Sequence, residues 1–243
     1  FYVQNTKGAV DSVKKHVHAM DILAPQTYAA TPTGALLGTP NKEVLSRAKS
    51  AGADVMPLVV NKDFSQKGVH QLLVNDSAQN ALIAALINEA KKYDYIGYQY
   101  DFEHIAADDR DRYTAFVQKT VPYFRGAGLQ LSVALAPVHS DDPRDYAIGS
   151  WDHWTGAFDY YAIGKAADFV SIMAYDDSKS IGPAASLPWA TSVLEYALAR
   201  IPAEKISFGV PFYAWVRRAS TNEKEYSRTY PAIAEILKSR SYI

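Results

Sequence analysis

Two kinds of segment alternate along the chain, one with the residues typical of strands and one with helical periodicity. Short runs rich in β-branched and aromatic residues predict seven strands, at 1–3, 22–24, 55–60, 95–102, 129–135, 169–175 and 206–213. Between them, apolar residues spaced three and four apart predict amphipathic helices, for example around 10–20, 82–90 and 113–124. The runs 55–60 and 129–135 are apolar almost throughout, which is typical of parallel strands covered by helices.

The rhythm of these segments predicts the fold class. Successive strands begin roughly 30 to 40 residues apart, the length of one βαβ unit, and no linker or low-complexity stretch divides the chain. We therefore expect one α/β domain over residues 1–243. Seven units, without a G-x-G-x-x-G after the first strand, favour a (β/α)₈ TIM-type barrel over an open doubly wound sheet. The eighth strand is not visible, because a helical stretch at 232–237 uses most of the residues after Tyr213, and we expect it to lie beyond Ile243.

Composition narrows the classes of function. The 243 residues carry 25 Lys and Arg against 26 Asp and Glu, and the basic residues are scattered, which argues against a nucleic-acid partner. There is no cysteine, which excludes a disulfide scaffold and a cysteine-ligated metal. No apolar run reaches the roughly 18 residues that would suggest a membrane span. The oligomeric state is left open.

The fourth predicted strand changes character at its carboxyl end, where barrel enzymes place their chemistry. Because side chains alternate between the two faces of a strand, Gln99, Asp101 and Glu103 share one face, and three aromatic residues share the other. We expect the aromatic face to pack on helices and the polar face to point into the barrel, with the two carboxylates about 6 to 7 Å apart. Neighbouring carboxylates push each other's proton affinities apart, so one can serve as an acid. The alternative is a strand end whose acidic groups are solvated or paired with Lys or Arg.

Three segments at strand ends also resemble one known family. The segment 96–103, IGYQYDFE, resembles the D-x-x-D-x-D-x-E signature of glycoside hydrolase family 18, the family of chitinases and related N-acetylglucosaminidases. Asp101 and Glu103 match its last two acidic positions, whereas Gln99 stands where an aspartate is usual and Ile96 occupies the first position. The segment MAYD at 173–176 resembles the family's M-x-Y-D motif, and GVPFY at 209–213 resembles its G-x-P-F-Y segment. The version of the first motif is most similar to bacterial members, including those that act on peptidoglycan.

The resemblance implies a retaining glycosidase that cleaves β-1,4-linked N-acetylglucosamine polymers, chitin or peptidoglycan glycan strands, by substrate-assisted catalysis. Glu103 would protonate the glycosidic oxygen while the substrate's own 2-acetamido oxygen attacks the anomeric carbon. Asp101 would accept the acetamido N–H, and Tyr175 would hydrogen-bond its carbonyl. The resemblance assigns substrate contacts to Asp176 and Tyr213, and we group Gln99 and Met173 with them. No cofactor is implied, and we expect a secreted or cell-envelope protein whose signal segment is not in this chain.

Aromatic residues near the predicted cleft are candidates for stacking on sugar rings. Trp189, after the sixth predicted strand, and Tyr28, after the second, are the best placed, although packing in the core explains either equally well. The six histidines show no H-E-x-x-H or comparable spacing, so we expect no catalytic metal.

Two other functions compete with the enzyme. The first is a catalytically silent, lectin-like relative that binds carbohydrate. Glu103 argues against it, since silent relatives commonly lose the acid, while Gln99 keeps it open. The second is a different β/α-barrel enzyme with an accidental resemblance, which the lack of phosphate-binding loops and metal spacings disfavours.

Overall fold

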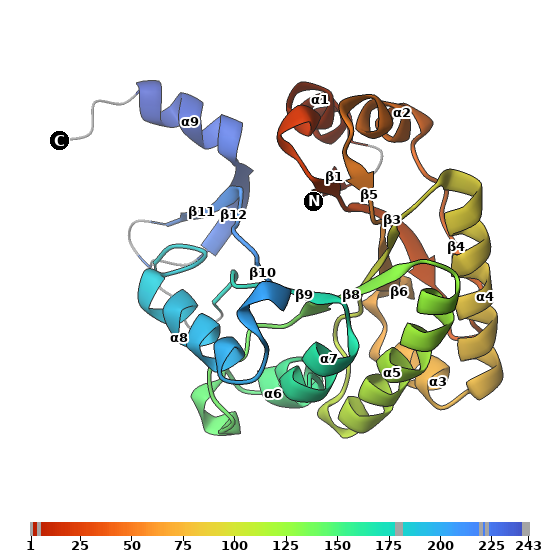
Figure 1. Ribbon diagram of the computed structural model, residues 1–243. Coiled ribbons are helices and arrows are strands. Elements are labelled where there is room, and N and C mark those ends of the chain that lie inside the picture. Colours follow the sequence, from red (N-terminus) through yellow and green to blue (C-terminus); the bar gives the residue numbers. More distant parts are fainter. Residues whose placement is uncertain (1, 4–5, 178–181, 219–220, 222–223, 240–243) are drawn as a thin grey trace.

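Seven parallel strands form the main sheet, and they lie side by side in the order in which they occur in the sequence (Figure 1). The computed structural model describes residues 2–3, 6–177, 182–218, 221 and 224–239. The strands are β1 (Tyr2–Val3), β3 (Pro25–Ala30), β6 (Leu58–Asn61), β7 (Gly97–Asp101), β8 (Gln130–Leu135), β9 (Phe169–Ile172) and β10 (Ile206–Phe208). A short eighth member, β4 (Leu36–Leu37), pairs antiparallel with β3.

Helices follow most of the strands, and those that connect strands of the main sheet lie on its outer face, whereas the last helix packs on the C-terminal hairpin (Figure 1). They are α1 (Lys7–His16), α2 (Lys42–Ala51), α3 (Gln66–Leu73), α4 (Asp76–Tyr93), α5 (Arg110–Gly126), α6 (Ser150–His153), α7 (Tyr160–Ala166), α8 (Leu187–Leu198) and α9 (Tyr230–Ser239). Side-chain caps fix several starts, since Thr6, Asn41 and Asn75 each accept a hydrogen bond from a backbone N–H in the first turn. Within the described ranges, no helix has both the length and the apolar character needed to cross a bilayer.

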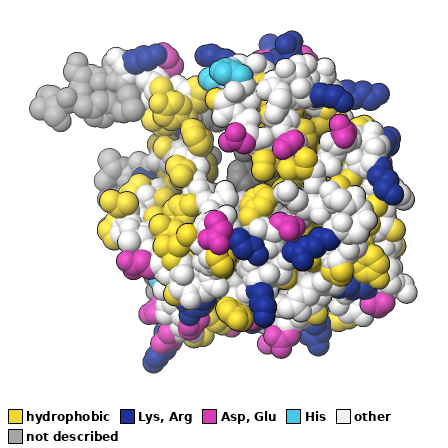
Figure 2. Space-filling view, viewed as in Figure 1, with side chains coloured by type: hydrophobic (Ala, Val, Ile, Leu, Met, Phe, Trp, Pro, Cys, Tyr) yellow, Lys and Arg dark blue, Asp and Glu magenta, His cyan; other side chains and the backbone are white. Residues whose placement is uncertain are grey.

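This arrangement confirms the predicted α/β class. Each parallel strand pairs with its predecessor in the main sheet, as the strands of a (β/α)₈ barrel do. In the part of the chain that the structure describes, no ladder joins β10 to β1 and no eighth parallel strand is present. Basic and acidic side chains are interspersed over the face shown in Figure 2, in keeping with the balanced charge.

Two predicted strands are wrong in their position. Ile22–Leu23 forms β2, which pairs with β5 (Asp54–Val55) in a separate two-stranded sheet, and the main-sheet strand is β3. β3 reads PQTYAA, which has few β-branched residues, so the pattern marked the neighbouring ILA run instead. The seventh strand ends at Phe208, because Gly209 and Pro211 interrupt it, and Tyr213 begins the antiparallel hairpin of β11 (Tyr213–Arg217) and β12 (Lys224–Thr229). Phe1 lies outside the described residues.

The alternation predicted along β7 is confirmed. Tyr98 and Tyr100 are fully buried on the outer face, where the Tyr98 hydroxyl donates to the carbonyl of Leu86 in α4 at 2.9 Å. Tyr100 stacks on Phe116 of α5 with ring centroids 5.3 Å apart. Burying these rings fixes which way the strand faces, so Gln99 and Asp101 must point into the sheet's interior.

The start of β7 tests how tightly the central strands pack. A Cβ at Gly97 would lie 2.0 Å from the carbonyl oxygen of Gln130, in the backbone of β8, which cannot move aside without breaking the ladder. We expect Gly97→Ala to lower the free energy of unfolding by roughly 1–3 kcal/mol or more, measured by chemical denaturation. Gly126→Ala is the matched control, because nothing lies within 4 Å of its Cβ, and it should be neutral or stabilising by up to about 1 kcal/mol. Equal stability of the two variants would contradict this packing.

Candidate active site

The inward face of β7 carries a row of polar side chains that ends at Glu103. Gln99 is 2% exposed, and its Nε2 donates to Ser132 Oγ on the neighbouring strand β8 at 3.0 Å. Asp101 follows at 8% exposed, and Glu103 is half-buried just past the end of the strand. The row therefore leads from the interior of the sheet to its carboxyl edge.

Asp101 carries a carboxyl group whose burial costs free energy. Its Oδ1 is buried and has no hydrogen-bond partner among the described residues, and the same is true of Gln99 Oε1. Burial, and then the negative charge of Glu103, raise the pKa of Asp101 to about 7. The side chain is thus poised to change protonation state near neutral pH, with an acceptor free for an incoming donor.

Glu103 is held through its backbone. The side-chain amide of Asn61, the last residue of β6, accepts from the Glu103 N–H at 2.9 Å and donates to the Glu103 carbonyl at 3.0 Å. Burial raises the pKa of the Glu103 carboxyl, as does the charge of Asp176, while His104 acts in the opposite direction. His104 itself has φ of 55°, in the left-handed region that non-glycine residues rarely adopt. Strain of this kind concentrates at functional sites.

Tyr175 comes to the same place from β9. Its phenol is surrounded by acidic groups, and burial followed by the charges of Asp101, Glu103 and Asp176 raises its pKa above the ordinary value. A Cβ at Gly209 would lie 2.9 Å from the Tyr175 ring, so this glycine makes room for the ring. Three strand ends, those of β7, β9 and β10, thus meet around one space.

Asp176 links this space to the C-terminal hairpin. It is exposed, has φ of 62°, and its backbone N–H donates to the Ala184 carbonyl at 2.7 Å. The hydroxyl of Tyr213 hydrogen-bonds the Asp176 carboxylate, and the Tyr213 ring packs edge-on against Tyr175 at 6.3 Å. The residues predicted from the second and third motifs are therefore brought together with those of the first.

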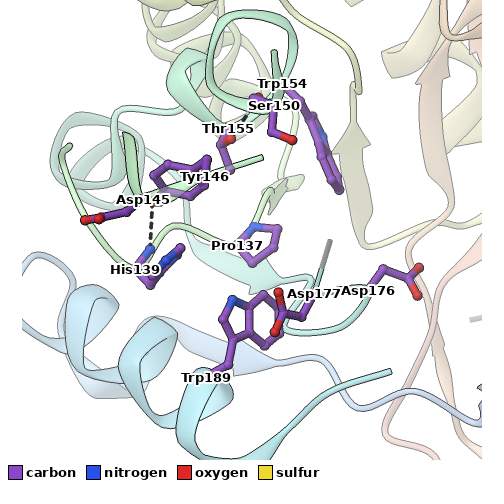
Figure 3. A pocket seen from close by; sticks show the side chains of 10 residues that line it. All are labelled: Pro137, His139, Asp145, Tyr146, Ser150, Trp154, Thr155, Asp176, Asp177 and Trp189. Atoms are coloured by element: carbon purple, nitrogen blue, oxygen red, sulfur yellow. Dashed lines mark hydrogen bonds between the residues drawn. The ribbon is translucent and has the colours of Figure 1, made fainter. Parts of the chain in front are cut away.

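An aromatic pocket adjoins the acidic residues, with Asp176 on its wall (Figure 3). Trp154 and Trp189 lie on opposite sides of it, with Pro137 between them. Tyr146 closes one end, held by hydrogen bonds that its hydroxyl accepts from the backbone of His139 and Ser140, each at 3.0 Å. Trp154 also approaches His104, the residue after Glu103, with ring centroids 6.1 Å apart.

The structure separates the two aromatic candidates. Trp189, from α8, lines the pocket, as a sugar-binding residue would. The prediction for Tyr28 is wrong, because Tyr28 lies inside β3, is 2% exposed, and its hydroxyl contacts Glu89 of α4 at 3.0 Å and Tyr95 at 3.2 Å. It faces the helices, since the true strand includes it and the alternation turns it outward. Met173 is 7% exposed at the end of β9.

Sequence reasoning missed several residues at this edge. Asn61 ends an apolar run and carries no family motif, so only its polar character at a strand end marked it. Ser132 faces Gln99 across the ladder, a pairing that needs the register to be known. Trp154 carries no family motif, and its place in the pocket depends on the irregular segment between β8 and α7. Among the residues that the structure describes, no group of three or more His, Asp or Glu side chains is placed to hold a metal.

Comparison with known proteins agrees with this geometry. The sequence profile described as "Glycosyl hydrolases family 18" matches residues 23–241, nearly the whole chain. The chain belongs to glycosyl hydrolase family 18. The matched range includes all three motif segments, at 96–103, 173–176 and 209–213.

Relatives within family 18 include two from Bacillus subtilis (strain 168). The chain is 28% identical over 222 residues to the uncharacterized glycosylase YvbX, covering 88% of this chain and 62% of the relative. It is 30% identical over 199 residues to a cortical fragment-lytic enzyme, covering 78% and 44%. A chitinase from Chromobacterium violaceum shares the fold with a TM-score of 0.81 at 23% identity, over 98% of this chain and 76% of that one. The chain thus spans about half the length of the curated relatives it matches.

The raised pKa of Asp101 makes a prediction about stability. Between its ordinary value of 3.8 and about 7, the folded protein holds a proton that the unfolded chain has lost, so the free energy of unfolding falls as pH rises through this window. The loss is on the order of 4 kcal/mol. Asp101→Asn removes it, so this variant should lose markedly less stability than the wild type between pH 4 and pH 8 in denaturant titrations.

Asp11→Asn is the control for this experiment. Asp11 is a carboxylate whose side chain is 54% exposed, 4.0 Å from Lys14, and its replacement should leave the pH dependence unchanged. Parallel pH profiles for the wild type and Asp101→Asn would show that Asp101 is not protonated abnormally.

Proposed function

We propose that the chain is a retaining glycoside hydrolase that cleaves β-1,4-linked N-acetylglucosamine polymers by substrate-assisted catalysis. One observation carries the proposal. The buried Oδ1 of Asp101 has no hydrogen-bond partner among the described residues, and the Asp101 carboxyl group lies close enough to Glu103 and Tyr175 to interact electrostatically with both. An acceptor left unsatisfied in the interior is unfavourable. An amide N–H of the substrate would satisfy it.

The chemistry assigns one role to each side chain. Glu103 gives its proton to the glycosidic oxygen, and the bond between that oxygen and the anomeric carbon breaks. The 2-acetamido oxygen of the same sugar attacks the anomeric carbon and forms an oxazolinium ion, with Asp101 accepting the acetamido N–H and Tyr175 donating to the oxygen. Glu103 then takes a proton from water, which opens the ring with retained configuration. Positioning and electrostatic stabilisation carry most of the rate.

The proton affinities suit these roles. Burial keeps Glu103 protonated to higher pH than an exposed glutamate, as a general acid requires. Burial, and then the surrounding acidic charges, raise the pKa of Tyr175, so its hydroxyl remains a donor at the pH where Glu103 acts. When Glu103 has given up its proton, its negative charge favours the protonated form of Asp101.

The aromatic pocket is where we place the neighbouring sugar of the polymer. The faces of Trp154 and Trp189 offer flat apolar surfaces for a pyranose ring, and Asp176 on the wall can accept hydrogen bonds from hydroxyls. One relative is named a cortical fragment-lytic enzyme and one structural neighbour a chitinase, so chitin and peptidoglycan glycan strands are the two substrates to compare.

Gln99 favours a second candidate, a carbohydrate-binding relative without turnover. It donates to Ser132 and cannot exchange a proton with Asp101 as a carboxyl group would. Binding without hydrolysis by the wild type, on both chitooligosaccharides and peptidoglycan fragments, would support this candidate.

The acid is tested by Glu103→Gln. We expect kcat on a chitooligosaccharide or muropeptide to fall by about 10²–10⁴-fold while oligosaccharide binding persists, because the amide keeps the shape but supplies no proton. Glu204→Gln is the matched control, since Glu204 is an exposed glutamate at the opposite end of β10. An analogue without the 2-acetamido group should not be cleaved. Undiminished turnover by Glu103→Gln would refute the assignment.

The pocket is tested by Trp189→Ala. Truncating an aromatic side chain that packs on a ligand removes roughly 1–2 kcal/mol of binding, so KM for a longer oligosaccharide should rise about 5–30-fold with a smaller change in kcat. Tyr123→Ala, which removes an aromatic ring 54% exposed on the outer helix α5, should change neither parameter. If both variants keep the wild-type KM, the sugar does not lie in this pocket.

A further inference from the structure

We propose that Asn61 is a positioning residue whose side-chain amide fixes the backbone of Glu103 and so aims the catalytic acid. This inference rests on the proposed function and adds to it a residue outside the three family motifs. The amide makes two hydrogen bonds to one residue, accepting from the Glu103 N–H at 2.9 Å and donating to its carbonyl at 3.0 Å.

The backbone of Glu103 needs such a partner because the sheet has already ended. The last pair between β6 and β7 joins Val60 to Asp101, and the last pair between β7 and β8 joins Tyr100 to Val133. Glu103 lies two residues beyond β7, where no ladder satisfies its peptide groups. A side-chain amide has the same donor and acceptor as a peptide, so Asn61 extends the ladder by one step from the neighbouring strand.

The chain bends sharply on both sides of this contact. His104, directly after Glu103, has φ of 55°, and Asp63 and Phe64, shortly after Asn61, have φ of 56° and 49°. Non-glycine residues hold such angles only where the surroundings impose them. The two hydrogen bonds tie the ends of β6 and β7 together at the point where both chains turn, and they thereby fix the direction in which the Glu103 side chain leaves the backbone.

Packing alone does not account for an asparagine here. Asn61 is 2% exposed and follows Val59 and Val60, so an apolar residue would fill the space without burying an amide. Both polar atoms of the amide are used on Glu103. A displacement of about 1 Å at a reacting group can lower a rate about 10²-fold. By holding the Glu103 backbone, Asn61 therefore holds the carboxyl group of the acid in position.

Asn61→Ala is the direct test. It removes both hydrogen bonds, and we expect kcat on a chitooligosaccharide to fall about 10- to 100-fold with KM changed less than about twofold, since the residues that bind the sugar are untouched. Gln79→Ala is the matched control. Gln79 is a buried amide whose Nε2 also donates to backbone carbonyls, those of Leu72 and Leu73, at 3.3 and 2.8 Å, between α3 and α4. It should lower stability and leave kcat within about twofold.

Asn61→Asp gives a second readout and covers the case in which the alanine variant does not fold. At low pH the introduced carboxyl is protonated and offers the same donor and acceptor, whereas at higher pH it is ionised and cannot donate to the Glu103 carbonyl. Its kcat relative to the wild type should therefore decline as pH rises, while the loss in Asn61→Ala is the same at every pH. The groups that face Glu103, namely Asp101, His104, Tyr175 and Asp176, are common to both variants.

Titration of the Glu103 carboxyl by NMR, assigned with Glu103→Gln, separates this inference from the proposed function. If the wild type turns over no glycan but the Glu103 pKa differs between the wild type and Asn61→Ala, the enzyme assignment fails and the positioning role stands. An unchanged Glu103 titration, or a loss of kcat no larger than that of Gln79→Ala, overturns the positioning role.

Discussion

The two-residue alternation along β7 is the constraint on which the site depends. Tyr98, Tyr100 and Phe102 must be buried against α4 and α5, and a shift of one residue would turn all of them inward. The same alternation turns Gln99 and Asp101 into the interior, and Glu103, two residues past the strand, is held at its edge by Asn61. The aromatic layer outside thus determines where the carboxyl groups lie, and packing energy far from the chemistry holds the chemistry in place.

Burying that polar row costs free energy, and hydrogen bonds within the protein offset only part of the cost. Gln99 recovers one hydrogen bond through Ser132, but Asp101 Oδ1 recovers none from the described residues. Burial, and then the charge of Glu103, raise the pKa of Asp101 to about 7. Left-handed residues follow directly at two of the strand ends, His104 after Glu103 and Asp176 after Tyr175. Contacts with neighbouring strands offset this strain, and the result is a group of acids held close together before any substrate arrives.

Sequence patterns predicted the parts of the fold that rest on local periodicity. The alternation of 98–103 and the apolar stripe of α5 needed only their own residues, and both are confirmed. The second strand was misplaced because PQTYAA is a weak β sequence, and Tyr28 was misassigned with it. The meeting of Tyr175 and Tyr213 with Glu103 came from the resemblance to a family, because periodicity gives no distance between separate units. Asn61 and Ser132 act across ladders, so their roles follow only from register.

The proposed chemistry and the proposed choice of substrate lie on different parts of this architecture. The proposed acid Glu103, its neighbour Asp101 and Tyr175 lie at or just past the carboxyl ends of β7 and β9. The aromatic pocket is built from the irregular segment between β8 and α7, together with the start of α8, where insertions and replacements disturb the core least. Two relatives can therefore share the residues that break the bond and differ in the sugar they accept next to it. We therefore propose that the choice of glycan in this chain depends on the aromatic pocket, through Trp154, Tyr146 and Trp189.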